Sequence, residues 1–388
     1  MGMRIGIDIR CLAEGKRTGV EEYTLALLRE LFESDQENEY ILFFNAWRHP
    51  APDVSWVEQY PRVTLKVFHI PNKLLNLSLW YFNFPKLDRL VGGTDVFFLP
   101  NLNFAAVSKK TKLVVTAHDL SFELFPETFS LKQRVWHYLV NFRSLVRRAD
   151  RVIAVSESTK GDLVSEYGVS PEKVLAIPSG IDSRFKRLDR NDPELLRVKE
   201  KHGLPYRFIL YLGTFEPRKN IRSLVLSYDA LQKTEIESVQ KYDLVLAGTR
   251  GWKYQDLFSA YQESPNQGRI HFPGFIADED KVALYNLASI FVYPSFYEGF
   301  GFPPLEAMAC GTPVITSHSS ALPEVIGAAG IMIDPYQPDE LLRTLQSLLE
   351  NQKLLTEMQE KGFAQAKKFS WHKTAEATLL VFQSLVKR

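Results

Sequence analysis

The chain has 388 residues, 45% of them hydrophobic and 24% charged, and a formal net charge of +1 at pH 7. This length fits two domains of ordinary size better than one core, and the charge balance gives no reason to expect nucleic acid as a partner. The two cysteines, Cys11 and Cys310, form neither a disulfide framework nor a metal-binding spacing, which favours a reducing, intracellular setting.

The N-terminal residues run directly into an apolar strand pattern, Arg4–Ile9, without the separate basic and apolar regions of a signal peptide. No uninterrupted apolar run approaches the length of a membrane-spanning helix. We therefore expect a cytoplasmic protein, either free or peripheral on the inner face of the membrane.

The first half of the chain alternates short apolar runs with helical patterns, which predicts a parallel sheet covered by helices. After Arg4–Ile9, the predicted strands are Tyr40–Phe44, Val63–Phe68, Asp95–Leu99, Leu113–Thr116, Arg151–Val155 and Lys173–Ile177. The first strand leads through a glycine-containing loop, 15–19, into an amphipathic helix from Gly19 to Leu31. Such a loop can hold an anion, but it lacks the GxGxxG dinucleotide pattern, and a plain turn stays open as the alternative.

His118 follows the predicted strand Leu113–Thr116. Active sites of parallel α/β sheets lie beyond the carboxyl ends of the strands, so His118 is a candidate site residue. A histidine at a strand end can instead be a buried, hydrogen-bonded structural residue, and the sequence leaves both interpretations open.

Two aromatic segments of the first half have no clear assignment. Leu74–Phe84 is strongly aromatic, and Lys132–Arg148 is predicted to be one helix that carries basic side chains beside aromatic ones. A basic amphipathic helix can lie on an anionic membrane surface. The alternative is a helix whose apolar side belongs to the core and whose basic face is solvated.

The second half restarts the βα pattern after a polar connector at 183–204, so we place the domain boundary after residue 182. Its predicted strands are Arg207–Leu212, Tyr242–Ala247, Arg269–Phe272, Ile290–Tyr293, Val314–Thr316 and Gly330–Ile333. Arg218 and Lys219 stand where the first of these strands turns into a helix. Both cations and the helix N-terminus can converge there on a phosphate; the alternative is a solvated basic loop.

The acidic run Asp278–Asp280 superficially matches an Asp-x-Asp metal motif. It precedes a predicted helix, Lys281–Ala288, and acidic residues at that position act as caps. We favour capping and expect that the protein requires no metal.

The run PSFYEGFGFPPLEAMACG, 294–311, predicts a strand end, a glycine loop and a helix. Gly299 and Gly301 permit positive φ or a close backbone approach, a proline suits the first helical turn, and Gly311 suits the helix C-terminus. The free N–H groups near Phe300 and Gly301 are then expected to face an anion.

Two carboxylates, Glu298 and Glu306, bracket this anion site with seven residues between them. Carboxylates do not bind phosphate, so their expected partners are hydroxyl groups of a ribose or a sugar ring. In the setting PSFYEGFGFPPLEAMACGTPVI this pair resembles the motif of retaining, nucleotide-sugar-dependent glycosyltransferases of family 4. The loops GTFEPRKN, 213–220, and HDLSFELFPETFS, 118–130, resemble the diphosphate loop and a mannosyltransferase loop of the same family.

The resemblance covers nearly the whole chain and implies the GT-B fold, an α/β architecture of two Rossmann-like domains whose parallel sheets face each other across a cleft. It implies an N-terminal acceptor domain over 1–182 and a C-terminal donor domain over 183–370. The last helix, 371–388, is expected to pack back on the first domain.

The resemblance also implies roles for individual residues. Glu298 is expected to bind and orient the donor sugar with His118 opposite it, and Glu306 to accept hydrogen bonds from the ribose. Phe275 and Ile276 match the loop that meets the base through backbone groups. The residues that match diphosphate-binding positions are Gly19, Arg218, Lys219, Phe300 and Gly301. Some members carry an arginine at the position of Thr214, so Arg218 and Lys219 would provide most of the charge neutralisation here.

The motifs look most like those of GDP-mannose-dependent mannosyltransferases, which implies transfer of mannose to a glycan or lipid-linked acceptor in polysaccharide biosynthesis. No protein nucleophile and no cofactor is implied. A UDP-sugar donor is the alternative, and a non-catalytic scaffold that binds nucleotide sugars also stays open. An epimerase of UDP-N-acetylglucosamine is disfavoured by the Glu298/Glu306 pair together with Arg218 and Lys219.

Overall fold

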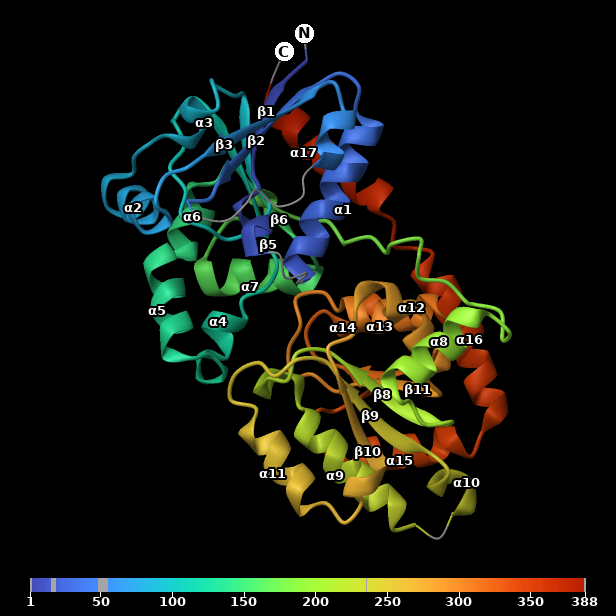
Figure 1. Cartoon of the computed structure of the whole chain (residues 1–388). Coiled ribbons are helices and arrows are strands. Elements are labelled where there is room, and N and C mark those ends of the chain that lie inside the picture. The colour runs from blue at the N-terminus through green and yellow to red at the C-terminus, as the bar shows by residue number, and fades with distance from the viewer. Residues whose placement is uncertain (1, 15–18, 48–54, 235, 387–388) are drawn as a thin grey trace. The chain divides into compact units, whose positions relative to one another are not determined.

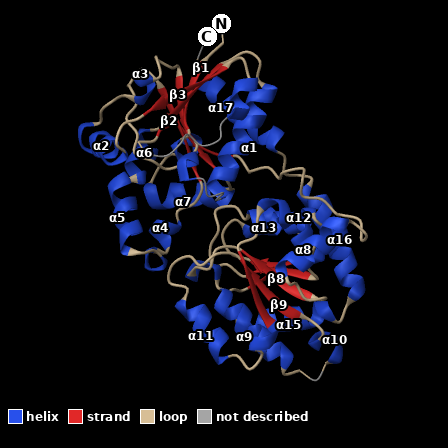
Figure 2. Ribbon diagram, viewed as in Figure 1, coloured by secondary structure: helices blue, strands red, loops and turns tan. Residues whose placement is uncertain are grey.

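The computed structural model describes residues 2–14, 19–47, 55–234 and 236–386. The chain divides into two compact units, each an α/β domain built on one sheet (Figures 1 and 2). The first unit contains the chain up to Leu120, Leu131–Gly180 and the residues from Ser370 onward; the second contains Ser121–Ser130 and Ile181–Phe369.

The first unit has a seven-stranded sheet in the order β3-β2-β1-β4-β5-β6-β7, and all neighbouring strands are parallel. Its strands are β1 (Arg4–Asp8), β2 (Glu39–Asn45), β3 (Val63–Phe68), β4 (Val96–Leu99), β5 (Lys112–Ala117), β6 (Arg151–Ala154) and β7 (Val174–Ala176). Every residue of β4 is buried, as expected for a central strand of a parallel sheet that is covered on both faces.

Helices and short turns surround this sheet. They are η1 (Arg10–Glu14), α1 (Gly19–Ser34), η2 (Ser55–Gln59), α2 (Asn72–Leu77), η3 (Ser78–Phe82), α3 (Leu87–Leu90), α5 (Leu131–Val140), α6 (Phe142–Arg148), α7 (Glu157–Tyr167), η5 (Pro171–Lys173) and α17 (Trp371–Leu385). Helix α17 packs beside α1 (Figure 1). Its Phe382 ring lies 5.3 Å from the ring of Phe98 in β4, so the last helix of the chain contributes to the core of the first unit.

The prediction of one helix over Lys132–Arg148 is wrong, because Asn141 separates α5 from α6. Asn141 has a φ of +50°, a left-handed conformation that asparagine tolerates better than most residues. Its side-chain oxygen accepts a hydrogen bond from the Ser144 N–H at 3.1 Å, which caps the start of α6. The basic and aromatic side chains of this segment therefore lie on two short helices rather than along one face.

The second unit has a six-stranded parallel sheet in the order β10-β9-β8-β11-β12-β13. Its strands are β8 (Phe208–Leu212), β9 (Asp243–Ala247), β10 (Ile270–Gly274), β11 (Ile290–Tyr293), β12 (Val314–Ser317) and β13 (Ile331–Ile333). In the first unit the strand order reverses between β1 and β4. In the second unit it reverses between β8 and β11. Ligands of doubly wound sheets bind at the carboxyl ends of the strands at this reversal. The predicted pair of parallel α/β sheets is confirmed.

The second unit has its own set of helices and turns. They are α4 (Ser121–Leu124), η4 (Pro126–Thr128), α8 (Pro193–His202), η6 (Pro217–Lys219), α9 (Ile221–Gln232), α10 (Glu237–Gln240), α11 (Gln255–Glu263), η7 (Gln267–Arg269), α12 (Asp278–Leu287), α13 (Phe302–Ala309), α14 (Leu322–Ile326), α15 (Pro338–Leu349) and α16 (Gln352–Ala366). No helix in the described part of the chain is long and apolar enough to cross a membrane.

The segment Ser121–Ser130 belongs to the second unit, although it lies within the residues 1–182 predicted for the first domain. Its Thr128 carbonyl accepts a hydrogen bond from the indole N–H of Trp252. Phe129 stacks on the Trp252 ring at 5.9 Å, and Phe125 packs against Tyr297 at 5.5 Å. These contacts fix the segment to the loops that follow β9 and β11.

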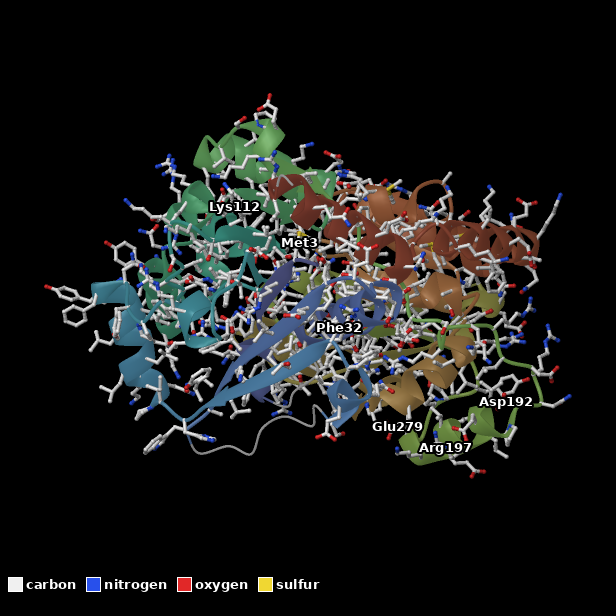
Figure 3. All side chains as sticks on the ribbon, turned by 90° about the horizontal axis from the view of Figure 1, so that it is seen from above. Met3, Phe32, Lys112, Asp192, Arg197 and Glu279 are labelled. Atoms are coloured by element: carbon white, nitrogen blue, oxygen red, sulfur yellow. The ribbon has the colours of Figure 1, made fainter. Side chains whose placement is uncertain are left out.

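Asp280 forms an ion-pair cluster between α8 and α12, which pack together and carry the labelled residues Arg197 and Glu279 in Figure 3. Its carboxylate is buried and contacts Arg197 at 2.8 Å, Lys201 at 2.7 Å and His202 at 2.8 Å. Burial raises the pKa of Asp280, but the hydrogen bonds from these three partners outweigh it and hold the pKa well below its usual range.

The acidic run 278–280 forms the first turn of α12, whereas the sequence predicted that it precedes the helix. Its main contact, however, is the cross-helix cluster of Asp280 rather than a cap, and the N-cap position is Ala277. Among the described residues no group of three or more histidine, cysteine, aspartate or glutamate side chains is arranged to hold a metal ion.

Candidate active site

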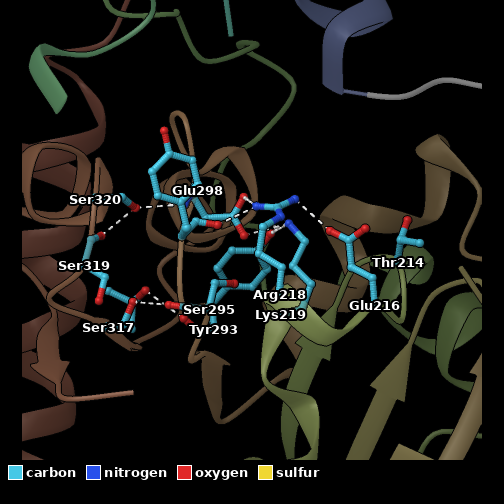
Figure 4. Close-up of polar contacts among 12 residues, drawn as sticks. Thr214, Glu216, Arg218, Lys219, Tyr293, Ser295, Glu298, Ser317, Ser319 and Ser320 are labelled. Carbon is cyan, nitrogen blue, oxygen red and sulfur yellow. Dashed lines mark hydrogen bonds and ion pairs between the residues drawn. The ribbon is translucent and has the colours of Figure 1, made fainter. Parts of the chain in front are cut away.

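Two loops of the second unit meet where the strand order reverses (Figure 4). One follows β8 and contains Arg218 and Lys219 in the turn η6; the other follows β11 and contains Glu298. Strands β8 and β11 pair in parallel, so their carboxyl ends and the loops after them lie at the same edge of the sheet. Residues some eighty positions apart in sequence are therefore brought into contact.

The Glu298 carboxylate binds both cations of the first loop. Its Oε2 lies 2.9 Å from Arg218 Nη1, and its Oε1 lies 2.7 Å from Lys219 Nζ. Glu216 also binds Arg218, at 2.7 Å from Nη2. Lys219 Nζ donates a second hydrogen bond, to the Tyr293 hydroxyl at 2.7 Å. The structure thus joins three of the predicted site residues and adds Glu216 and Tyr293, which sequence reasoning missed. We call Glu216, Arg218, Lys219 and Glu298 the charge cluster.

Burial and charge set the protonation of this cluster. Burial alone would raise the pKa of Glu298, but the charges of Arg218 and Lys219 outweigh it and lower the pKa to about 2. The pKa of Lys219 is lowered by burial and by the neighbouring Arg218, while Glu298 acts in the opposite direction. Glu298 is therefore a carboxylate at neutral pH, able to accept hydrogen bonds from hydroxyls and unsuited to donate a proton.

A third loop holds the backbone of Glu298. The Ser320 hydroxyl accepts a hydrogen bond from the Glu298 N–H at 2.8 Å, and the Ala321 N–H donates to the Glu298 carbonyl at 3.3 Å. Ser320 has a φ of +52°, an uncommon conformation for a residue with a side chain. No sequence motif marked Ser320, because its role depends on the loop after β12 lying beside the loop after β11.

Because the folded-state pKa of Glu298 lies below its ordinary value of 4.5, the charge cluster should stabilise the fold above about pH 5. That stabilisation should be lost as the pH falls through 4.5 towards 2. We expect the difference in unfolding free energy between the wild type and Glu298→Gln to reach about 3 kcal/mol at pH 7 and to shrink towards pH 3. Urea unfolding of both proteins at a series of pH values measures this difference in free energy. A difference that does not change with pH would contradict a stabilising role for the charge of Glu298.

Helix α13 begins next to Glu298 with the geometry that the glycines predicted. Gly301 is its N-cap and has a φ of +112°; a Cβ there would lie 2.8 Å from Leu322 Cδ2. Gly311 follows the helix with a φ of +83°. The Phe300 ring is buried against Phe302 and Phe369, so this residue can offer a ligand only its backbone. The positive φ allowed at Gly301 and the position of Gly311 at the helix C-terminus are confirmed, whereas Gly299 does not take a positive φ.

Glu306 lies at the start of the second turn of α13. It is buried, and its Oε2 accepts a hydrogen bond from the Tyr285 hydroxyl at 2.8 Å. Burial and the nearby Glu306 raise the pKa of Tyr285 well above its usual value, so this hydroxyl remains a donor. Of the two residues predicted to meet a base, Phe275 is exposed and Ile276 is buried, between β10 and α12. The side chain of Ile276 belongs to the core, and only its backbone is suited to a ligand.

The remaining predicted residues lie in the first unit. Gly19 is the first residue of α1, and the loop 15–18 before it lies outside the described residues. His118 directly follows β5, and its Nε2 lies 2.8 Å from the Pro100 carbonyl after β4. A carbonyl only accepts hydrogen bonds, so Nε2 carries the proton. Burial lowers the pKa of His118, which favours the neutral ring with Nδ1 as an acceptor.

The first unit also contains a buried ion pair that sequence reasoning missed. Arg10 Nη2 lies 2.6 Å from Asp8 Oδ2 at the carboxyl end of β1, and it donates to the Phe104 carbonyl at 2.7 Å. His118 packs its ring edge-on against Tyr23 of α1 at 4.8 Å. Asp8 ends β1, which borders the reversal in strand order where doubly wound sheets bind ligands, and His118 follows β5, one strand beyond β4.

Comparison with known proteins identifies two family models. Residues 17–185 match the model described as Glycosyltransferase Family 4, and residues 192–365 match the model described as Glycosyl transferases group 1. The O-antigen chain mannosyltransferase B of Escherichia coli is 30% identical over 381 residues, which cover 95% of this chain and 96% of that protein. The serotype-specific mannosyltransferase WbdA of E. coli is 34% identical over 281 residues, 71% of this chain but only 34% of WbdA.

Solved structures support the fold. Anabaena HepE in complex with UDP and glucose has a TM-score of 0.71 at 19% identity, covering 98% of this chain and 100% of that chain. WaaG, a glycosyltransferase involved in lipopolysaccharide biosynthesis, has a TM-score of 0.70 at 15% identity, covering 99% and 100%. The predicted two-domain GT-B fold is confirmed.

Proposed function

We propose that this chain, which belongs to glycosyltransferase family 4, transfers mannose from GDP-mannose to a glycan or lipid-linked acceptor in polysaccharide biosynthesis. The observation that carries the proposal is the charge cluster, in which Arg218 and Lys219 both contact Glu298 at the ends of β8 and β11. The two E. coli relatives, both named mannosyltransferases, support mannose as the sugar.

In the proposed reaction, Arg218 and Lys219 bind the donor diphosphate and stabilise the negative charge that builds on it as the sugar leaves. Lys219 has three N–H donors, and its contacts with Tyr293 and Glu298 leave the third for a phosphate oxygen. Glu298 accepts hydrogen bonds from the donor sugar and orients its anomeric carbon, and His118 faces the same sugar.

We further propose that the configuration at the anomeric carbon is retained. The bond from that carbon to the diphosphate oxygen breaks, and the acceptor oxygen forms the new bond on the same face. The acceptor proton passes to the diphosphate oxygen, so no protein nucleophile is needed. Since Arg218 and Lys219 supply positive charge at the leaving group, the proposed reaction requires no metal.

The donor nucleotide is tested by calorimetric titration with GDP, UDP and ADP, each in the presence of a chelator. We expect selective binding of GDP without metal. Selective binding of UDP would move the donor to a UDP-sugar, a candidate that the UDP and glucose in the HepE structure supports. No binding of any nucleotide would favour a scaffold without activity.

Glu306→Gln is expected to weaken GDP binding about tenfold, because one or two hydrogen bonds from ribose hydroxyls to a charged acceptor are reduced. The buried carboxylate also keeps its partner Tyr285 in place. The matched measurement is the affinity for guanine alone, which lacks the ribose and should change little. An equal loss for guanine and GDP would indicate that Glu306 only maintains the fold.

We also propose that the first unit contacts an anionic membrane surface, where a lipid-linked acceptor would lie. Two of its segments expose large apolar side chains: Tyr81 and Phe82 on η3 are 71% and 68% exposed, and Tyr138 on α5 is 82% exposed. Exposed apolar patches of this kind mark interaction sites. The neighbouring Lys132 and Arg134 are exposed as well, and cations beside aromatic side chains suit anionic lipid headgroups.

Sedimentation with vesicles tests this contact. We expect the wild type to bind phosphatidylglycerol vesicles, to bind phosphatidylcholine vesicles weakly, and to dissociate with added salt. Replacing Tyr81 and Phe82 by serine should weaken binding about tenfold. Tyr206→Ser, an equally exposed tyrosine of the second unit, is the control. Binding that is insensitive to Tyr81 and Phe82 would contradict the proposed surface.

A further inference from the structure

The second unit contains a pocket of about 300 Å³ beside the charge cluster, with which it shares only Glu216 among its lining residues. It lies between the N-terminal ends of α9 and α11, which neighbour each other in Figure 1, and under the loops that follow β8 and β9. A volume of this size is at the lower end of the range for ligand pockets, and it suits about one or two sugar rings.

The pocket combines aromatic walls with a mixed polar rim. The rings of Tyr254 and Phe296 are half-buried and line it, and Leu257 lies at its base. Each ring is held by a neighbour: Tyr254 packs on Phe258 at 5.5 Å, and Phe296 packs on Tyr336 at 4.8 Å. Aromatic faces fixed in this way offer apolar surface to the C–H side of a sugar ring.

Charged side chains of both signs line the pocket. Glu216 and Asp256 bring two carboxylates, and Arg222 and Lys253 bring two cations. Glu216 is already paired with Arg218, and the other three charged side chains are exposed and of both signs, so the lining is not dedicated to one kind of ion. Closely spaced donors and acceptors instead match a neutral polyhydroxyl ligand, whose hydroxyl groups both donate and accept hydrogen bonds.

The walls are fixed before any ligand binds. The Phe215 N–H donates to the Thr249 carbonyl at 2.8 Å, and the Gly251 N–H donates to the Phe215 carbonyl at 3.0 Å, which ties the two loops together. Lys253 has a φ of +52°, a strained conformation for lysine. Its Nζ donates to the Glu127 carbonyl of the segment Ser121–Ser130. Such a pre-organised pocket loses little entropy when it binds a ligand.

One side chain belongs to both the pocket and the charge cluster. Glu216 lines the pocket, and its Oε1 contacts Arg218, which in turn contacts Glu298. A ligand that contacts Glu216 in the pocket is therefore connected through one ion pair to Arg218, the residue assigned to the donor diphosphate. This neighbourhood suits a part of the substrate better than an unrelated effector.

We propose that this pocket binds about one or two hexose residues of the acceptor glycan, away from the hydroxyl that receives the sugar. The proposal rests on the proposed function, since it takes the acceptor to be a mannose-containing glycan. Tyr254 and Phe296 then bind the acceptor and favour longer acceptors. They take no part in the chemistry of transfer.

The test measures binding of α-linked mannotriose by saturation-transfer NMR, with GDP affinity measured in parallel by calorimetry. We expect saturable binding to the wild type, and binding about tenfold weaker or lost in Tyr254→Ala. Tyr206→Ala, an exposed tyrosine of the same unit outside the pocket, should bind mannotriose as the wild type does. GDP affinity should stay unchanged in both variants, which shows that the unit is folded.

Asp256→Asn is the second variant, because Asp256 is exposed at the rim and its replacement does not disturb the core. It should weaken mannotriose binding by a smaller factor, again without a change in GDP affinity. Mannotriose binding that is equal in the wild type and in Tyr254→Ala overturns the pocket assignment, as does a wild type that binds GDP but no mannotriose. A wild type that binds mannotriose but no GDP or other nucleotide would instead overturn the proposed function.

Discussion

Glu298→Gln is expected to reduce sugar transfer about a thousandfold while GDP binds as tightly as to the wild type or more tightly. The amide keeps the shape of the side chain but loses the charge with which Glu298 accepts hydrogen bonds from the donor sugar. The same change removes the carboxylate that competes with a diphosphate for Arg218 and Lys219, so affinity for the nucleotide should not fall. Initial rates with GDP-mannose and calorimetry with GDP measure the two effects separately.

Glu216→Gln is the matched control, because it removes a buried carboxylate that also binds Arg218 but is not assigned to the donor sugar. We expect it to reduce transfer about tenfold or less. Two results would sink the donor-sugar role of Glu298: a loss of GDP binding as large as the loss of transfer, or an equal loss of transfer in Glu216→Gln. Either would mean that the carboxylate acts only by holding the cations in place.

Arg218→Gln is expected to weaken GDP binding by about 30- to 100-fold, while the affinity for GMP changes about threefold or less. The reason is that the guanidinium is assigned to the diphosphate, and GMP lacks the second phosphate. Lys219 remains and retains part of the affinity. Calorimetric titration of both nucleotides into the wild type and the variant measures the difference directly.

Arg222→Gln provides the control for this second prediction. Arg222 lies four residues further along, in the first turn of α9, and it is exposed and outside the charge cluster. Its replacement should leave the preference for GDP over GMP unchanged. The diphosphate assignment of Arg218 and Lys219 is wrong if wild-type protein binds GDP and GMP equally, or if Arg222→Gln loses as much GDP affinity as Arg218→Gln.

Much of the fold follows from local sequence. The strand β3 has the predicted bounds Val63–Phe68, and β11 has the predicted bounds Ile290–Tyr293. Strand β11 can be read from sequence because the parallel sheet buries all four of its residues, which requires a short continuous apolar run. Strand β3 lies at the edge of its sheet and has no buried residue, so its β-branched residues, and not burial on both faces, mark it as a strand. The helix break at Asn141 was missed, since the amphipathic pattern on either side continues through it and one left-handed residue leaves that pattern unchanged.

The sequence alone also determined the residues of the motifs. Gly301 and Gly311 take the positive φ angles predicted for them, because backbone conformation without a Cβ is a local property. The order of Glu298, Glu306, Arg218 and Lys219 along the chain was enough to suggest a donor site, and their proposed roles still come from the family resemblance.

Only the tertiary structure decided how these groups are paired. Glu298 and Arg218 are 80 positions apart, and they meet because β8 and β11 lie next to each other in the sheet. The same adjacency gives Lys219 its contact with Tyr293. Burial then gives these pairs their strength, since charges removed from water interact more strongly with each other. Side-chain pairing across two loops depends on strand order, which no single segment of the chain encodes.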